Sequence, residues 1–272
     1  MNEFAITHAG PVRFAIVGLV FGVLLLAQMM RPRRGEHSSL ARRLRNVGLT
    51  LIAALIVYLV LPLTAVGFAL LVEQRQIGFF HHFDWPFGLE LAISVIVLDL
   101  AIYWQHRWMH VLPWLWRIHR VHHTDTQFEV TLGLRFHPAE ILLSLFYKFA
   151  VIAALGVAPI SVLCYEILLA VFALFSHADL HIPTTWERRL RWFVITPDWH
   201  RVHHSVHRVE TDSNYGNLLS LWDRLFRSMV AQPRDGHRSM SIGLDEFREE
   251  RSQRLAALLV LPILPDRHTS RR

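Results

Sequence analysis

Residues 47–72 read VGLTLIAALIVYLVLPLTAVGFALLV, an apolar run that contains no charged residue. A helix needs about 20 mostly apolar residues to cross the hydrocarbon core of a bilayer. Pro62 lies inside the run and is expected to kink the helix. A membrane helix tolerates such a kink, because neighbouring helices can satisfy the backbone groups that a proline frees. The run therefore predicts a membrane-spanning α-helix.

Three further apolar stretches repeat this pattern. Residues 14–30 and 87–104 are each long enough for one span, and residues 139–175 are long enough for two short helices with a turn near Gly156. Asp99, Lys148 and Glu166 lie inside these stretches, and such residues face a bundle interior or reach toward the membrane surface. The sequence predicts an all-α, multi-spanning membrane protein with a cytoplasmic helical cap that binds metal.

Composition and charge agree with a membrane location. The chain has 272 residues, of which 53% are hydrophobic and 18% charged, with a net charge of +6; soluble domains average about 25% charged residues. Six arginines fall between residues 31 and 45, as in the cytoplasmic loops of membrane proteins, and this placement argues against a nucleic-acid partner. Counting spans from this loop puts residues 106–138 and the chain after 176 on the cytoplasmic side. We expect an integral protein of a bacterial inner membrane.

Histidines form the most informative pattern in the chain. Of 18 histidines, ten fall into four tight groups: His106 and His110; His119, His122 and His123; His177 and His181; and His200, His203 and His204. Residues three or four apart share one face of a helix, so each group can direct several imidazoles toward one metal. All four groups fall on the side predicted to be cytoplasmic, and we predict that all ten histidines bind metal.

The number of histidines restricts the metal. Ten ligands exceed what one or two tetrahedral zinc ions take, whereas two metals would receive about five each and keep an open position in octahedral geometry. Imidazole suits iron, copper, nickel and zinc alike, but two open sites fit O₂ chemistry on non-haem iron. Cys164 is the only cysteine, which excludes an iron–sulfur cluster. We predict two iron ions (Fe²⁺/Fe³⁺), with O₂ as co-substrate.

Acidic residues near the histidines are candidates for supporting the ligands. Ligating imidazoles usually donate their second N–H to a carboxylate or a carbonyl. Asp99 lies on one helical stripe with His106 and His110, and Glu140, Asp198 and Asp223 lie close in sequence to other groups. Each is expected either to support a ligand or to act as a helix cap or salt-bridge partner.

Several strings of residues resemble the fatty acid hydroxylase/sterol desaturase superfamily. They are DLAIYWQHRWMH (99–110), LWRIHRVHH (115–123), HPAE (137–140), TPDWHRVHHS (196–205), DSNYGN (212–217) and LWDRLF (221–226). The resemblance covers about residues 90–230, and the combination of motifs is highly specific. It implies a helical membrane domain with a cytoplasmic di-iron site and the four histidine groups as ligands. It also singles out His137, either as a ligand or as a supporting group, and Asn214 as a supporting group.

Members of this superfamily hydroxylate or desaturate sterols, fatty acyl chains, carotenoids or ether lipids, and the resemblance implies a lipid substrate of this kind. No nucleotide-binding glycine pattern is visible, so the electrons are expected from a separate reductase with a ferredoxin or cytochrome b₅-like carrier. The alternatives are a metal-dependent membrane hydrolase and a non-enzymatic haem or metal carrier. The expected organisation is membrane-anchoring spans (1–85), a di-iron domain (86–230) and a C-terminal cytoplasmic tail (231–272), for which an interfacial position is one alternative.

Overall fold

The computed structural model describes residues 7–35 and 38–265, and this part of the chain is helical without β-strands. Its long helices are α2 (Ala9–Met30), α3 (Leu40–Val60), α4 (Ala65–Gln74), α5 (Phe87–Val111), α7 (Pro138–Leu155) and α8 (Pro159–His177). Five segments are long and apolar enough to cross a membrane: α2, the α3–α4 segment Leu40–His82, α5, α7 and α8. The predicted all-α, multi-spanning membrane fold is confirmed.

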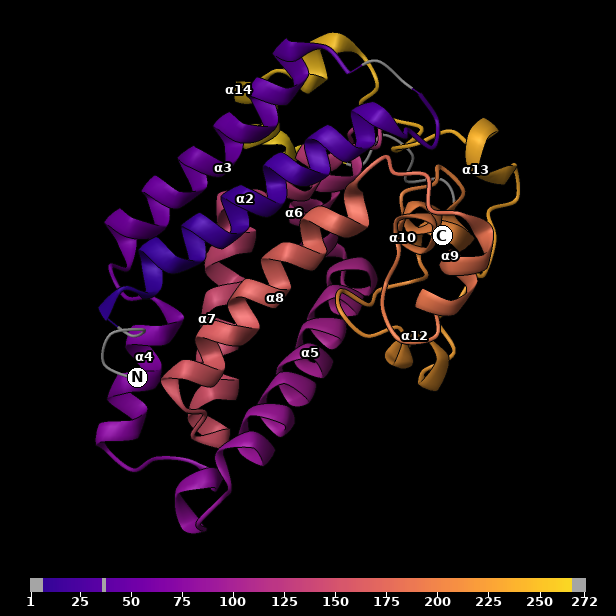
Figure 1. Cartoon of the computed structure of the whole chain (residues 1–272). Coiled ribbons are helices and arrows are strands. Elements are labelled where there is room, and N and C mark those ends of the chain that lie inside the picture. The colour runs from indigo at the N-terminus through magenta and orange to yellow at the C-terminus, as the bar shows by residue number, and fades with distance from the viewer. Residues whose placement is uncertain (1–6, 36–37, 266–272) are drawn as a thin grey trace.

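Shorter helices gather at one end of the long ones, where α5 and α8 end (Figure 1). They are α6 (Pro113–His123), α9 (Thr184–Leu190), α10 (Pro197–His203), α11 (Arg208–Thr211), α12 (Leu221–Leu225), α13 (Gly236–Ser239) and α14 (Leu255–Val260), with 3₁₀ turns at Val130–Leu134, Glu250–Gln253 and Leu261–Ile263. A further 3₁₀ turn, Phe79–His82, lies between α4 and α5.

The structure corrects one detail of the predicted spans. Residues 47–72 do not form a single kinked helix: α3 ends at Val60, and α4 begins at Ala65. Pro62 has no N–H for a continuing helix, and the Thr64 side chain caps the new helix by accepting from the N–H of Gly67. The turn predicted near Gly156 is confirmed, since Gly156 ends α7 in the left-handed conformation with φ of 73°.

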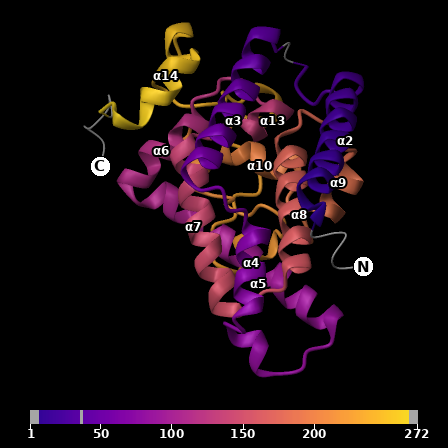
Figure 2. The same ribbon diagram turned by 90° about the vertical axis from the view of Figure 1, so that its left-hand side faces the viewer.

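The interior of the bundle is apolar. Leu98 of α5, Ile152 of α7 and Val162 of α8 are buried in one cluster with Ala69 of α4. On the outside, large apolar side chains such as Phe14, Leu55 and Leu59 are exposed, as expected where lipid replaces water. Figure 2 shows α2 and α3 standing beside α7 and α8 in a second view of this bundle.

The C-terminal segment packs against the helices. Leu258 and Leu261 are buried in a cluster with Leu49 of α3 and Val121 of α6. The Arg120 guanidinium also donates to the backbone carbonyls of Leu261 and Leu264. This apolar segment therefore buries one face on the fold, next to the helix that carries the second histidine motif.

Candidate metal centre

Four helices bring the histidines together at the end of the bundle. His106 and His110 lie on α5, the His119 motif on α6, His177 at the last residue of α8, and the His200 motif on α10 with His204 as its C-cap. Helices α6, α8 and α10 thus end at His123, His177 and His203. The carboxyl end of a helix carries partial negative charge, so three helix ends favour a cation here.

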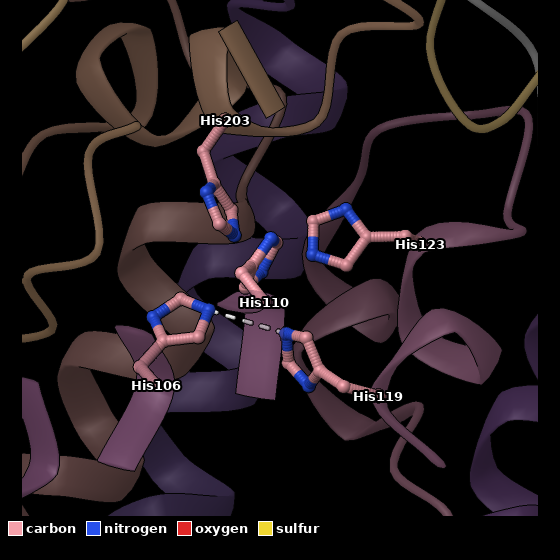
Figure 3. A group of neighbouring side chains, drawn as sticks. All are labelled: His106, His110, His119, His123 and His203. Carbon is pink, nitrogen blue, oxygen red and sulfur yellow. Dashed lines mark hydrogen bonds between the residues drawn. The ribbon is translucent and has the colours of Figure 1, made fainter. Parts of the chain in front are cut away.

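The first histidine group contains five side chains: His106, His110, His119, His123 and His203. Each offers one donor atom, and these atoms all lie within 4.8 Å of one another. Figure 3 shows the five rings turned toward a common centre, with the Nε2 atoms of His106 and His119 3.2 Å apart. The Nε2 atoms of His110, His123 and His203 are buried and have no hydrogen-bond partner.

The outer nitrogens of this group are held by the protein. The Nδ1 atom of His106 lies 2.7 Å from the carbonyl oxygen of Tyr215, and that of His203 lies 2.6 Å from the carbonyl of Ser213. The Nδ1 of His119 lies 2.7 Å from Oε1 of Glu140. These acceptors keep the proton on Nδ1, so that Nε2 presents its lone pair to the centre of the group.

The second histidine group contains four side chains: His122, His177, His200 and His204. The Nε2 atom of His177 lies 3.1 Å from the Nε2 atoms of each of the other three. Its Nδ1 lies 2.6 Å from the carbonyl oxygen of Ala173, and a neutral imidazole carries only one N–H. The Nε2 of His177 is therefore a lone-pair acceptor, crowded by three further nitrogens.

This crowding fits a metal ion. Nitrogens at right angles around an ion, each about 2.1 Å from it, lie about 3.0 Å apart. The observed spacing of 3.1–3.2 Å between nitrogens in the two groups is close to that value. The residues present therefore fit a metal in each group, with five candidate ligands in the first and four in the second.

In five grouped histidines that lie outside the membrane-spanning helices, burial favours the neutral form of the imidazole. Burial lowers the pKa values of His122, His123, His200, His203 and His204 well below 6.5, and neighbouring histidines lower them further. The imidazoles are accordingly neutral at physiological pH, which is the form that binds metal.

His181, predicted as a ligand, belongs to neither group. Helix α8 ends at His177, so the helical spacing expected between His177 and His181 is not realised. The backbone N–H of His181 instead donates to the carbonyl of Arg31.

His137 also lies in neither group. It caps α7, and its Nδ1 accepts from the N–H of Ala139 while its Nε2 lies 3.2 Å from the carbonyl of Leu259. In the HPAE motif (137–140), it is Glu140 that contacts a histidine of the first group, His119.

Asp99 and Asp223 act through a loop rather than through a histidine side chain. Asp99 accepts from the backbone N–H groups of Leu218 and Leu219 and from the indole of Trp222. Asp223 accepts from the backbone N–H groups of Tyr215 and Gly216, from the Trp199 indole and from the Ser228 hydroxyl. The two carboxylates fix the segment whose Tyr215 carbonyl holds His106. Burial raises the pKa of Asp223 to about 6, against the effect of these donors.

Asn214 and Asp198 secure α10 from two sides. The Asn214 amide, at a residue with φ of 51°, donates to the carbonyls of Trp199 and Val230. Asp198 pairs with Arg201 of α10 and, 3.1 Å away, with Arg33 from the loop after α2. Burial alone would raise the pKa of Asp198, but Arg201 and Arg33 outweigh it and lower the pKa.

The first two spans contribute supporting residues that the sequence reasoning missed, since it gave them only an anchoring role. Arg42 of α3 is buried and donates to Asp125 and Glu129, with nitrogen–oxygen distances of 2.7 and 2.8 Å. Gln28 of α2 donates to Glu129 and accepts from the N–H of Asp179. The sequence offered two signals of this supporting role: a lone glutamine in an apolar run, and an arginine at the start of a helix.

A cavity of about 670 Å³ joins the histidines to the membrane-spanning helices. His106 and His119 of the first group and His122, His177 and His200 of the second all line it. The rest of its wall is mostly apolar and includes Tyr58, the 61–64 linker after α3 and Ala65 at the start of α4. An apolar chain can therefore lie against both groups at once.

Comparison with known proteins agrees with the resemblance noted in the sequence. The chain is 29% identical over 177 residues to an ornithine lipid hydroxylase of Rhizobium tropici, covering 64% of this chain and 52% of that protein. It is 28% identical over 141 residues to an alkylglycerol monooxygenase of Xenopus tropicalis (52% and 30%), and 23% identical over 147 residues to a cholesterol 25-hydroxylase of Rattus norvegicus (53% and 47%). The matches thus span about half or less of these relatives. No solved structure matches the chain significantly.

The family model for fatty acid hydroxylases matches residues 91–228, just over half of the chain, and this range includes all nine histidines of the two groups. The chain belongs to the fatty acid hydroxylase family.

Proposed function

We propose that this chain is a membrane oxygenase that uses two iron ions and O₂ to hydroxylate or desaturate a lipid. The observation that carries the proposal is the pair of histidine groups at the end of an apolar cavity inside a membrane protein. The relatives named above are an ornithine lipid hydroxylase, an alkylglycerol monooxygenase and a cholesterol 25-hydroxylase, which supports a lipid substrate.

The two groups would each hold one iron, and the bound irons would supply the O₂ chemistry that an unactivated C–H bond requires. The residues of the protein would position the imidazoles and the lipid, and they would exclude water. The carbonyls of Tyr215 and Ser213 and the Glu140 carboxylate orient three imidazoles, while the apolar walls align the lipid and keep solvent away.

The arginine-rich loop supports a cytoplasmic location for the site. Arg33 pairs with Asp198, and the backbone N–H of Arg34 donates to Asp179, so this loop contacts the segments that carry the histidines. Positively charged loops remain in the cytoplasm. The site would then face a cytoplasmic reductase with a ferredoxin or cytochrome b₅-like carrier, in a bacterial inner membrane.

Iron content and its loss in matched variants test the proposal. We expect protein from iron-57-fed cells to show two irons per chain by Mössbauer spectroscopy. His203 and His204 are adjacent in sequence but belong to different groups, so His203→Ala and His204→Ala should each deplete a different iron. His207→Ala is the control, since His207 pairs with Asp235 outside both groups.

Lipid oxidation should require both O₂ and a reductant. Zinc that iron cannot replace, or turnover of a lipid ester without O₂, would reject the oxygenase in favour of a hydrolase. A Soret band in the purified protein would instead indicate a haem carrier.

A further inference from the structure

Three ionisable side chains lie in the wall of the cavity, away from the histidines. The Lys148 ammonium of α7 lies 2.5 Å from Oε1 of Glu166 of α8, and the Arg13 guanidinium of α2 lies 2.6 Å from Oε2 of the same carboxylate. The Lys148 and Glu166 side chains are 13% and 5% exposed. Ionisable groups at this depth are costly in a membrane and commonly mark a substrate path.

The cluster carries one uncompensated positive charge, because two cations face one carboxylate. Both oxygens of Glu166 are engaged. An ammonium has three N–H donors, and within residues 7–35 and 38–265 Lys148 makes a hydrogen bond only to Glu166. Two donors of Lys148 therefore remain for an oxygen-bearing group in the cavity that it lines.

An apolar passage separates this cluster from the histidines. On α7, Glu140 lines the cavity beside the first group and Lys148 lines it further along; a helical rise of 1.5 Å per residue puts them roughly 12 Å apart. On α8, the same rise separates Glu166 from His177 by roughly 16 Å. Between these positions, the wall is formed largely by apolar residues such as Leu145, Leu169 and Ala173.

We propose that Lys148, with Arg13 and Glu166, binds the anionic group of an amphiphilic substrate, a carboxylate or a phosphate. The distance to the histidines then sets which carbon of the attached chain reaches the metal centre. This inference rests on the proposed lipid-oxidising function and adds to it a class of substrate and a rule for the position of attack.

The alternative is that the ion pair only ties α7 to α8, and two variants separate the possibilities. Lys148→Gln breaks the pair, leaves Glu166 paired with Arg13, and lowers the charge of the cluster from +1 to 0. Glu166→Gln breaks this pair and also the pair with Arg13, and it raises the charge to +2. A purely structural role predicts that Glu166→Gln, which loses two ion pairs, weakens binding at least as much as Lys148→Gln, whereas an anion site predicts opposite effects of the two changes.

Binding can be measured in detergent without O₂, using radiolabelled palmitate competed by unlabelled palmitate, palmitate methyl ester or a lysophosphatidate. We expect Lys148→Gln to weaken palmitate binding at least tenfold, and Glu166→Gln to retain or strengthen it. Lys148→Arg should keep binding. If Lys148→Gln does not fold, Glu166→Gln and the comparison of acid with ester still test the inference. Equal affinity for acid and ester, or a loss in Glu166→Gln equal to or larger than that in Lys148→Gln, would overturn the inference. The stronger competitor identifies carboxylate or phosphate as the anion.

Product analysis gives a second, independent readout. With iron, O₂ and a reductant, the oxidised carbon should keep a constant distance from the anionic group as the chain is lengthened. Oxidation at a constant distance from the methyl end would contradict the inference while leaving the proposed function intact. Intact palmitate binding without any oxidised product would count against the proposed function instead.

Discussion

The Nδ1 atom of His119 lies 2.7 Å from Oε1 of Glu140, and both side chains are buried in the wall of the cavity that reaches the membrane helices. This contact joins two motifs, on α6 and α7, that are separated in the sequence. It fixes the imidazole so that Nε2 faces the first histidine group, and it places a negative charge next to the predicted metal.

Replacing Glu140 should weaken metal binding without emptying the site. Groups that hold a ligating histidine commonly contribute 10–100-fold to metal affinity, so we expect a loss of about that size in Glu140→Gln. Competition with a calibrated chelator measures it. Glu73→Gln, on the exposed part of α4, serves as control, and equal affinity in both variants would show that Glu140 does not orient His119.

Asp223 should stabilise both the fold and the metal centre. Its carboxylate accepts four hydrogen bonds, two of them from the loop that holds His106, and each bond to a charged group contributes about 1.5–3 kcal/mol. An asparagine turns an N–H₂ group toward some of these donors. We therefore expect Asp223→Asn to lower both thermal stability and iron content. Asp235→Asn, in an exposed pair with His207, should change neither. Normal iron content in Asp223→Asn would argue against a role of Asp223 in the metal centre.

Arg42 should be essential for stability, although it lies in the segment predicted only to anchor the chain. Removing one partner of a buried ion pair costs about 3–5 kcal/mol, because the other charge stays buried. After Arg42→Met, the cations that still face Asp125 and Glu129 are Arg135 and Arg43, at the longer distances of 3.6 and 3.7 Å. Thermal unfolding in detergent measures the loss.

Lysine should not restore the stability lost at Arg42, since it cannot form the bidentate contact that Arg42 makes with Asp125. Arg45→Met is the control, because Arg45 pairs with Glu250, whose side chain is 74% exposed, and surface pairs contribute about 0–1 kcal/mol. A similar small effect at Arg42 would contradict the proposed support of the metal centre by α3.

His237 should make stability depend on pH. Burial lowers its pKa from 6.5 to about 4, against the attraction of Asp198. The unfolded chain therefore takes up a proton below pH 6.5 while the folded chain does not, so stability is complete above this pH and is lost as the pH falls toward 4. The shift corresponds to at most about 3 kcal/mol.

Comparing His237→Gln with the unmodified chain isolates this effect from that of the other histidines. The difference in unfolding free energy between the two should change across pH 4–6.5 and stay constant above it. A difference that is independent of pH would show that folding does not shift the pKa of His237.

Local patterns explain what the sequence predicted well. The spans follow from apolar runs, and the turn at Gly156 follows from a residue that tolerates positive φ. The pairing of His106 with His110 depends only on the four-residue spacing of a helix, which α5 realises. His181 shows the limit of this reasoning, because the spacing has meaning only where the helix continues, and α8 ends at His177.

The division of the histidines between the two groups depends on tertiary structure. His122 and His123 are adjacent, as are His203 and His204, yet each pair is split between the groups. Successive residues on a helix point about 100° apart, so neighbours face different centres once the helices are packed. The sequence by itself determined the membrane helices and the number and spacing of the histidines, since both are set by local composition and spacing. Only the packing of α5, α6, α8 and α10 decided which nitrogens meet, because these contacts join residues far apart in the chain.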